Sequence, residues 1–192
     1  ELTAYDDMYK ADRAFTSKLD YPATVKQLLL EVCDACDIPV GSPTFKNETY
    51  QIQTKPEGKT ARQIVGYIAQ IACGNAVMQS GTLVIRSYDF GAFQAVTDGI
   101  KESELQDNAG YYIISDYPSE PNISTDNITI TGISTKIRQE NEDVTLVQGS
   151  DEYCLEIENP LIEGNEETAL ALIGKTLIGT TICKFSGSFF SD

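Results

Sequence analysis

Two segments of the chain carry apolar residues at the spacing of an amphipathic helix. Each segment follows a Thr-x-x-Gln phrase, Thr24 to Gln27 and Thr60 to Gln63, which is typical of a helix capping box. The pattern predicts one helix from about 25 to 36 and another from about 61 to 72, with Gly74 as the left-handed residue after the second. The predicted buried positions are Val25, Leu28, Leu29, Val32, Cys33 and Cys36 in the first helix and Ala61, Ile64, Val65, Ile68, Ala69 and Ala72 in the second.

Short strands are predicted around these helices. Residues 50–53 alternate between apolar and polar side chains, and 76–78 and 83–86 flank the phrase Gln-Ser-Gly-Thr, which favours a hairpin. Residues 17–90 are therefore predicted to form a small α+β unit, in which two amphipathic helices cover a short sheet.

The second half of the chain reads mainly as β structure. Residues 91–127 are polar and rich in turn formers, with a loop bracketed by Pro118 and Pro121. Isoleucines from 128 to 137 predict a long strand that is broken near Gly132. Further strands are predicted at 144–147, 153–157 and about 181–185, and a helix at about 166–178.

Charge and composition exclude several classes of function. The 192 residues include 14 Lys and Arg, 29 Asp and Glu and no His, for a net charge of -15. Without His the chain cannot form a Ser-His-Asp or Cys-His site, an HExxH zinc site or a two-His iron site. The charge opposes binding to nucleic acid or to an anionic membrane surface, and no apolar run approaches the roughly 20 residues of a membrane span. We therefore expect no specific nucleic-acid binding and no membrane insertion.

The five cysteines, at 33, 36, 73, 154 and 183, do not predict a metal or redox site. Cys33 and Cys36 have the C-x-x-C spacing, but no second pair and no His completes a zinc site. The pair falls at the end of a predicted helix, where the helix dipole does not stabilise a thiolate. We interpret these residues as small buried apolar side chains of a protein made in a reducing cytoplasm.

Other motifs give equally weak evidence for a catalytic or binding site. Gly174-Lys175-Thr176 resembles the end of a phosphate-binding loop, but position 169 is Ala where the motif requires Gly, and a helix is predicted instead of a loop. Carboxylate pairs are frequent in so acidic a chain and are interpreted as solvated surface. We therefore predict no catalytic, cofactor-binding or metal-binding residue and no enzymatic activity.

Five phrases along the chain resemble tail proteins of tailed bacteriophages and prophages, in the same order. The phrase at 2–10 resembles AYDxMYK, the phrase at 60–69 resembles TxRQVLGYIAE, and the last phrase stands in place of YRPFS. In this sequence the phrases are LTAYDDMYK at 2–10, LDYPATVKQLL at 19–29, TARQIVGYIA at 60–69, ENPLI at 158–162 and CKFSG at 183–187.

The resemblance is to baseplate hub or tail-tip proteins, also called tail-associated endopeptidase-type proteins. It implies an α+β fold in which a β-barrel-like domain, related to the tail tube, carries an inserted small α+β domain. The barrel-type domain would comprise 1–16 and 91–192, including the helix at about 166–178, and the insertion would comprise 17–90. The resemblance also implies a ring, usually a homotrimer, that closes the tail tube and contacts distal tail or tail-tube proteins.

The leading hypothesis is thus a virion structural protein of a phage or prophage tail, made in the cytoplasm of the bacterial host and cut from a longer protein. An acidic wall of the tube would repel passing DNA. Two alternatives stay open: a fragment of a tail-associated peptidoglycan hydrolase, and a generic carbohydrate- or small-molecule-binding α+β module with a pocket lined by Tyr side chains.

Overall fold

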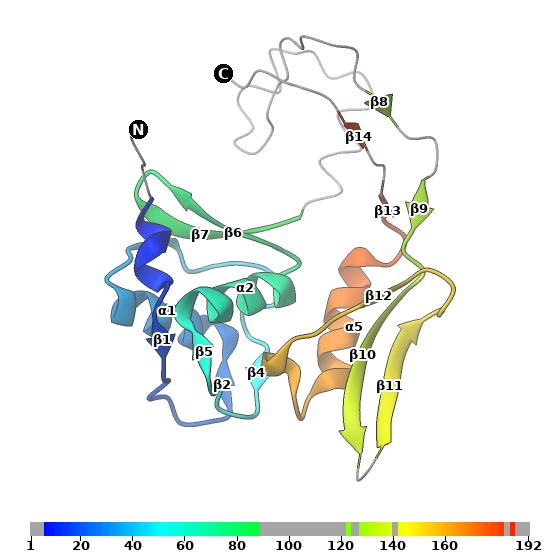
Figure 1. Ribbon diagram of the computed structural model, residues 1–192, viewed down its shortest axis with the longest axis horizontal. Coiled ribbons are helices and arrows are strands. Elements are labelled where there is room, and N and C mark those ends of the chain that lie inside the picture. Colours follow the sequence, from blue (N-terminus) through cyan, green and yellow to red (C-terminus); the bar gives the residue numbers. More distant parts are fainter. Residues whose placement is uncertain (1–5, 89–121, 124–126, 140–141, 183–184, 187–192) are drawn as a thin grey trace. The chain divides into compact units, whose positions relative to one another are not determined.

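The computed structural model describes residues 6–88, 122–123, 127–139, 142–182 and 185–186 (Figure 1). These residues fall into two compact units, one within Glu1–Tyr88 and Thr131–Ile178, the other within Asp89–Ile130 and Gly179–Asp192. The described part of the chain is mixed α+β, with three α-helices and several small sheets.

The first part of the first unit alternates short strands with two helices. Its elements are η1 (Asp7–Ala11), β1 (Ala14–Phe15), β2 (Ala23–Thr24), α1 (Val25–Cys36), β3 (Val40–Ser42), β4 (Gln51–Ile52), β5 (Lys59–Thr60), α2 (Ala61–Ile71), β6 (Gly74–Gln79) and β7 (Thr82–Ser87).

Both helices begin at the predicted capping boxes. In each box the Thr side chain accepts a hydrogen bond from the backbone N–H three residues later, and the Gln side chain accepts one from the Thr backbone N–H. All twelve predicted stripe positions are buried, and α2 buries Ile71 in addition. The capping and the periodicity together determine where these helices start and which face enters the core.

The prediction for Gly74 is wrong. The left-handed residue after α2 is Cys73, with φ 50°, and Gly74 is instead the first residue of β6. A Cβ at position 74 would lie 1.9 Å from the carbonyl oxygen of Arg86 on β7. Glycine is therefore required here because the two strands approach closely, and not because of its freedom at positive φ.

The predicted hairpin is confirmed. β6 pairs antiparallel with β7, and the two loop residues, Ser80 and Gly81, both have positive φ, as a type I′ turn requires. β3 pairs with β7 to complete a sheet of order β3-β7-β6. Leu83 and Ile85 of β7 are buried, and α2 packs against β6 and β7.

The second part of the first unit is a sheet with one helix. β10 (Gly132–Gln139) is central, β11 (Glu142–Gly149) pairs with it antiparallel and β12 (Cys154–Glu156) pairs with it parallel. The short helix η2 (Pro160–Ile162) leads to α5 (Glu166–Leu177), which packs against β10 and β11 (Figure 1). The strands predicted at 144–147 and 153–157 and the helix at 166–178 are thus confirmed within a few residues.

The second unit is described only in short pieces. β8 (Asn122–Ile123) pairs with β14 (Phe185–Ser186), and β9 (Ile128–Thr129) pairs with β13 (Thr181–Ile182), both antiparallel. The long strand predicted from 128 is therefore two elements, β9 and β10, which the structure assigns to different units. Most of the loop predicted at 91–127, with Pro118 and Pro121, lies outside the described residues.

The predicted α+β class is confirmed, and the predicted β-barrel-like domain is not. No sheet within the described residues closes into a barrel. The predicted domain boundaries, 1–16 with 91–192 against 17–90, stay a prediction. Contacts among the described residues join α1 and α2 to α5 in one compact unit.

Replacement of Gly74 with Ala should destabilise the protein by about 1–3 kcal/mol, because the added methyl group meets backbone atoms that cannot rotate away. Gly66 supplies a matched control, since it lies on the exposed side of α2 and a Cβ there meets nothing within 4 Å. Gly66→Ala should stabilise the protein by about 0.5–1 kcal/mol. Urea unfolding curves of both variants would measure these effects, and equal stability of the two would contradict the assignment.

Candidate functional site

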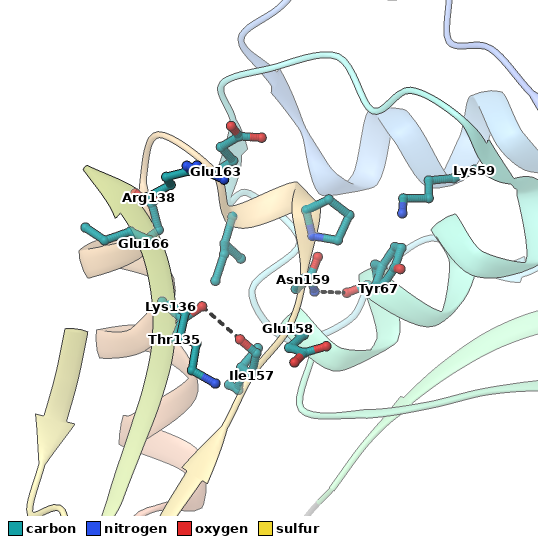
Figure 2. A pocket seen from close by; sticks show the side chains of 13 residues that line it. Lys59, Tyr67, Thr135, Lys136, Arg138, Ile157, Glu158, Asn159, Glu163 and Glu166 are labelled. Atoms are coloured by element: carbon teal, nitrogen blue, oxygen red, sulfur yellow. Dashed lines mark hydrogen bonds between the residues drawn. The ribbon is translucent and has the colours of Figure 1, made fainter. Parts of the chain in front are cut away.

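A hollow of about 630 Å³ opens between the second half of β10, the C-terminal part of α2 and the segment that follows β12 (Figure 2). Polar and charged side chains make up most of its wall. The lining residues are Lys59, Tyr67, Thr135, Lys136, Ile137, Arg138, Ile157, Glu158, Asn159, Pro160, Ile162, Glu163 and Glu166.

The hollow exists because the chain turns away from β10 at Asn159. Its side-chain amide nitrogen donates to the carbonyl oxygen of Tyr67 at 2.9 Å and to Oε1 of Gln70 at 2.8 Å. Its side-chain oxygen accepts a hydrogen bond from the N–H of Leu161 at 2.9 Å and so caps η2. Asn159 is buried, and all these bonds are satisfied within the protein. This side chain therefore has a structural role and is not offered to a ligand.

Two further polar groups of the wall have partners within the protein. The Thr135 hydroxyl donates to the carbonyl oxygen of Ile157 at 2.8 Å (Figure 2). The Lys136 ammonium lies 2.6 Å from a carboxylate oxygen of Glu156. The hydrogen bond and the charge of Glu156 raise the pKa of Lys136, with smaller contributions from the charges of Glu158 and Asp143.

Two cations of the wall remain without such a partner. No ion pair joins Lys59 or Arg138 to a carboxylate within the described residues. The Lys59 ammonium lies 6.0 Å from the centre of the Tyr67 ring, at the outer limit of a cation–π contact. These two cations share the wall with the carboxylates of Glu158, Glu163 and Glu166.

The backbone of β10 is also open toward the hollow. The carbonyl oxygen of Ser134 accepts from the N–H of Ile157, which shows that the polar backbone groups of Ser134 point away from β11. Because successive residues of a strand point their N–H and C=O groups to opposite edges, those of Lys136 and Arg138 point the same way as those of Ser134. The pairing with β12 ends at Ser134. Lys136 and Arg138 thus present backbone donors and acceptors to the hollow.

This arrangement offers charged and hydrogen-bonding groups for binding. The hollow brings together the carboxylates of Glu158, Glu163 and Glu166 and the cations of Lys59, Lys136 and Arg138. Within the part of the chain that the structure describes, no group of three or more His, Cys, Asp or Glu side chains could hold a metal ion. What the wall supplies is an open strand edge beside a cation and an aromatic ring.

The other residues considered from the sequence lie outside the hollow or serve the fold, although Glu166 also lines the hollow. Gly174, Lys175 and Thr176 fall inside α5, near its C-terminal end, and Gly174 is buried. Asp6 caps η1, and Glu166 accepts a hydrogen bond from the N–H of Gly164 at 3.0 Å. Sequence reasoning missed the hollow. The one available signal was the Asn159-Pro160 breaker after a strand.

Three of the four described cysteines behave as buried apolar side chains. Cys33, Cys36 and Cys73 are buried free thiols, and Cys154 is half-buried. Burial raises the pKa of Cys33 from 9.0 to about 12, with a smaller contribution from Cys36. This is the opposite of the shift that an active thiol requires. Cys183 lies outside the described residues.

The comparisons with known proteins add no assignment. No protein-family model, curated protein or solved structure matches this chain. Among the described residues, no helix is both long enough and apolar enough to span a membrane.

Asn159→Asp should destabilise the protein by about 1–3 kcal/mol, because a carboxylate cannot donate to the Tyr67 carbonyl oxygen or to Oε1 of Gln70 and would place its charge against both acceptors. The neighbouring Glu158 is exposed, so Glu158→Gln should change the unfolding free energy by less than about 0.5 kcal/mol. Chemical denaturation of both variants tests the role of the amide. A stable Asn159→Asp variant would show that the junction does not depend on it.

The thiols should differ in reactivity in the folded protein. At pH 8, which is below the pKa of about 12, Cys33 stays protonated and buried, so alkylation should modify Cys154 and spare Cys33. Because the folded pKa exceeds the unfolded one, the stability that Cys33 contributes is present below pH 9 and is lost as the pH rises toward 12. Mass spectrometry of peptides after iodoacetamide treatment would measure the modification, with urea-unfolded protein as the fully reactive control.

Proposed function

We propose that this chain is a structural component of a phage or prophage tail and forms part of a ring at the end of the tail tube. The identity of the system rests on the order of the five phrases along the sequence. The observation that carries the assembly role is the β11-β10-β12 sheet, in which β11 pairs with β10 alone among the described residues.

The surface of this sheet supports a role in assembly. Val147 on β11, Leu155 on β12 and the adjacent Tyr153 are 44%, 41% and 51% exposed. Val147 lies at one edge of this sheet and Leu155 at the other, and strand edges with exposed apolar side chains are surfaces that soluble monomers usually cover. Neighbouring subunits of a ring would cover them.

The proposal also includes the two predicted domains. The sheet of β10, β11 and β12 would be a section of the barrel wall, and the α1–α2 region would be the inserted domain. The acidic residues suit a wall beside passing DNA, because like charge repels phosphate. The proposal assigns no enzymatic activity to the protein.

The proposal predicts where the protein lies in the particle. Electron microscopy of purified tails that carry an affinity tag on this protein, labelled with gold, should place the label at the distal end of the tail tube. An untagged phage gives the background, and a tag on the tail-tube protein gives the control for label along the shaft. Label absent from particles, or spread along the shaft, would refute the proposal.

A separate measurement distinguishes the hydrolase alternative. Zymography on peptidoglycan should give no clearing by residues 1–192, with lysozyme as the positive control. Clearing by this chain alone would replace the structural role with a lytic one.

A further inference from the structure

We propose that the open half of β10 binds β11 of a second copy of this chain, so that one sheet continues from subunit to subunit through the hollow. This inference rests on the proposed function, since it names the surfaces by which the ring subunits would meet. It concerns two different edges of one sheet, one that donates a strand and one that accepts it.

The accepting edge is the second half of β10, and the space for an added strand is already present beside it. The N–H and C=O groups of Lys136 and Arg138 point into the hollow, on the side where the pairing with β12 has ended. The chain that could have continued this pairing leaves at Asn159, which is held on α2 by its amide. The space of about 630 Å³ beside the strand is therefore kept open by a buried junction. An added strand needs this combination of free backbone groups and adjacent space.

The donating edge is β11. Its paired residues include Thr135 with Leu146 and Ile137 with Val144, whose polar backbone groups face each other across the hairpin. The groups of the alternate residues, Asp143, Thr145 and Val147, therefore point away from β10. All three side chains are exposed. β11 can add to a second sheet without giving up any hydrogen bond to its own.

Charge favours this pairing over a pairing of two β11 strands. The segment 142–149 contains Glu142 and Asp143 and no basic residue. The accepting hollow contains Lys59 and Arg138, which have no ion-pair partner within the described residues. Two β11 strands would bring only acidic charges together, whereas the hollow has a mixed wall in which Lys59, Lys136 and Arg138 lie beside Glu158, Glu163 and Glu166.

The contact is head-to-tail, because the two edges are different surfaces. Such contacts close into rings or continue as filaments, depending on the rotation from one subunit to the next. A two-fold dimer of β11 strands would stop at two subunits. The proposed pairing is therefore compatible with a ring of any number of copies.

The first test uses the backbone of β11. In Thr145→Pro the lost N–H points away from β10, so the hairpin keeps its hydrogen bonds while the outer edge is blocked. Sedimentation velocity over a concentration series should show weak self-association of the natural chain, kept by Thr145→Ala and weakened roughly tenfold or more by Thr145→Pro. Circular dichroism and the unfolding midpoint verify that both variants fold. Equal association of the two folded variants would overturn the proposal.

The second test separates the two edges. Lys59→Glu damages the accepting hollow and leaves β11 intact, so this variant should also associate weakly. An equimolar mixture of Lys59→Glu and Thr145→Pro retains one intact donor and one intact acceptor and should form a one-to-one pair that does not grow. A Lys59→Glu variant that associates as well as the natural chain would overturn the head-to-tail arrangement in favour of paired β11 strands.

The third test needs no variant of the protein. A synthetic peptide of sequence EDVTLVQG, residues 142–149, should shift the backbone amide signals of Lys136 and Arg138 in a ¹⁵N–¹H spectrum, and EDVPLVQG should not. Shifts confined to other strands, or none, would overturn the proposal. Failure here leaves the tail assignment standing, because the position of the protein in the particle is measured independently by gold labelling.

Discussion

The arrangement of the first unit depends on one buried amide, that of Asn159. It bonds the segment after β12 to the end of α2, and it caps η2 in the same step. Two further hydrogen bonds join the same two parts of the chain. The Tyr50 hydroxyl donates to the carbonyl oxygen of Asn165 at 3.1 Å, and the side-chain amide of Asn165 donates to the carbonyl oxygen of Gln51 at 3.2 Å. Because polar groups buried without partners are costly, these bonds fix the register of the two parts as well as their contact.

The junction also explains why the site is a hollow and not a continued sheet. β12 follows β10 for three residues, and the chain then turns toward α2 at Ile157–Asn159. From there β10 has β11 on one side and space on the other. Of the cations around this space, Lys136 is paired with Glu156, whereas Lys59 and Arg138 have no ion-pair partner within the described residues, and the edge is therefore polar and accessible.

Local features of the fold were predictable from the sequence, and contacts between distant segments were not. The capping phrases at Thr24 and Thr60 and the apolar stripes determine α1 and α2 because they act within a few residues. Gly74 was misread because its role depends on Arg86 of the facing strand. The hollow was missed for the same reason, since it requires knowing that Asn159 meets Tyr67. In the sequence, the polar residues of the hollow could not be distinguished from the other residues of an acidic surface.

The distance along the chain between these two residues has a consequence for folding. The bond from Asn159 to Tyr67 joins positions 92 residues apart, so the unit cannot be completed until most of the chain has been synthesised. Contacts of such long sequence separation slow folding, because a large loop must close before they form. During synthesis α1, α2 and the β6–β7 hairpin can fold first from local signals. The side of α2 that receives η2 and α5 then stays in water, and in this interval the new chain is most exposed to aggregation.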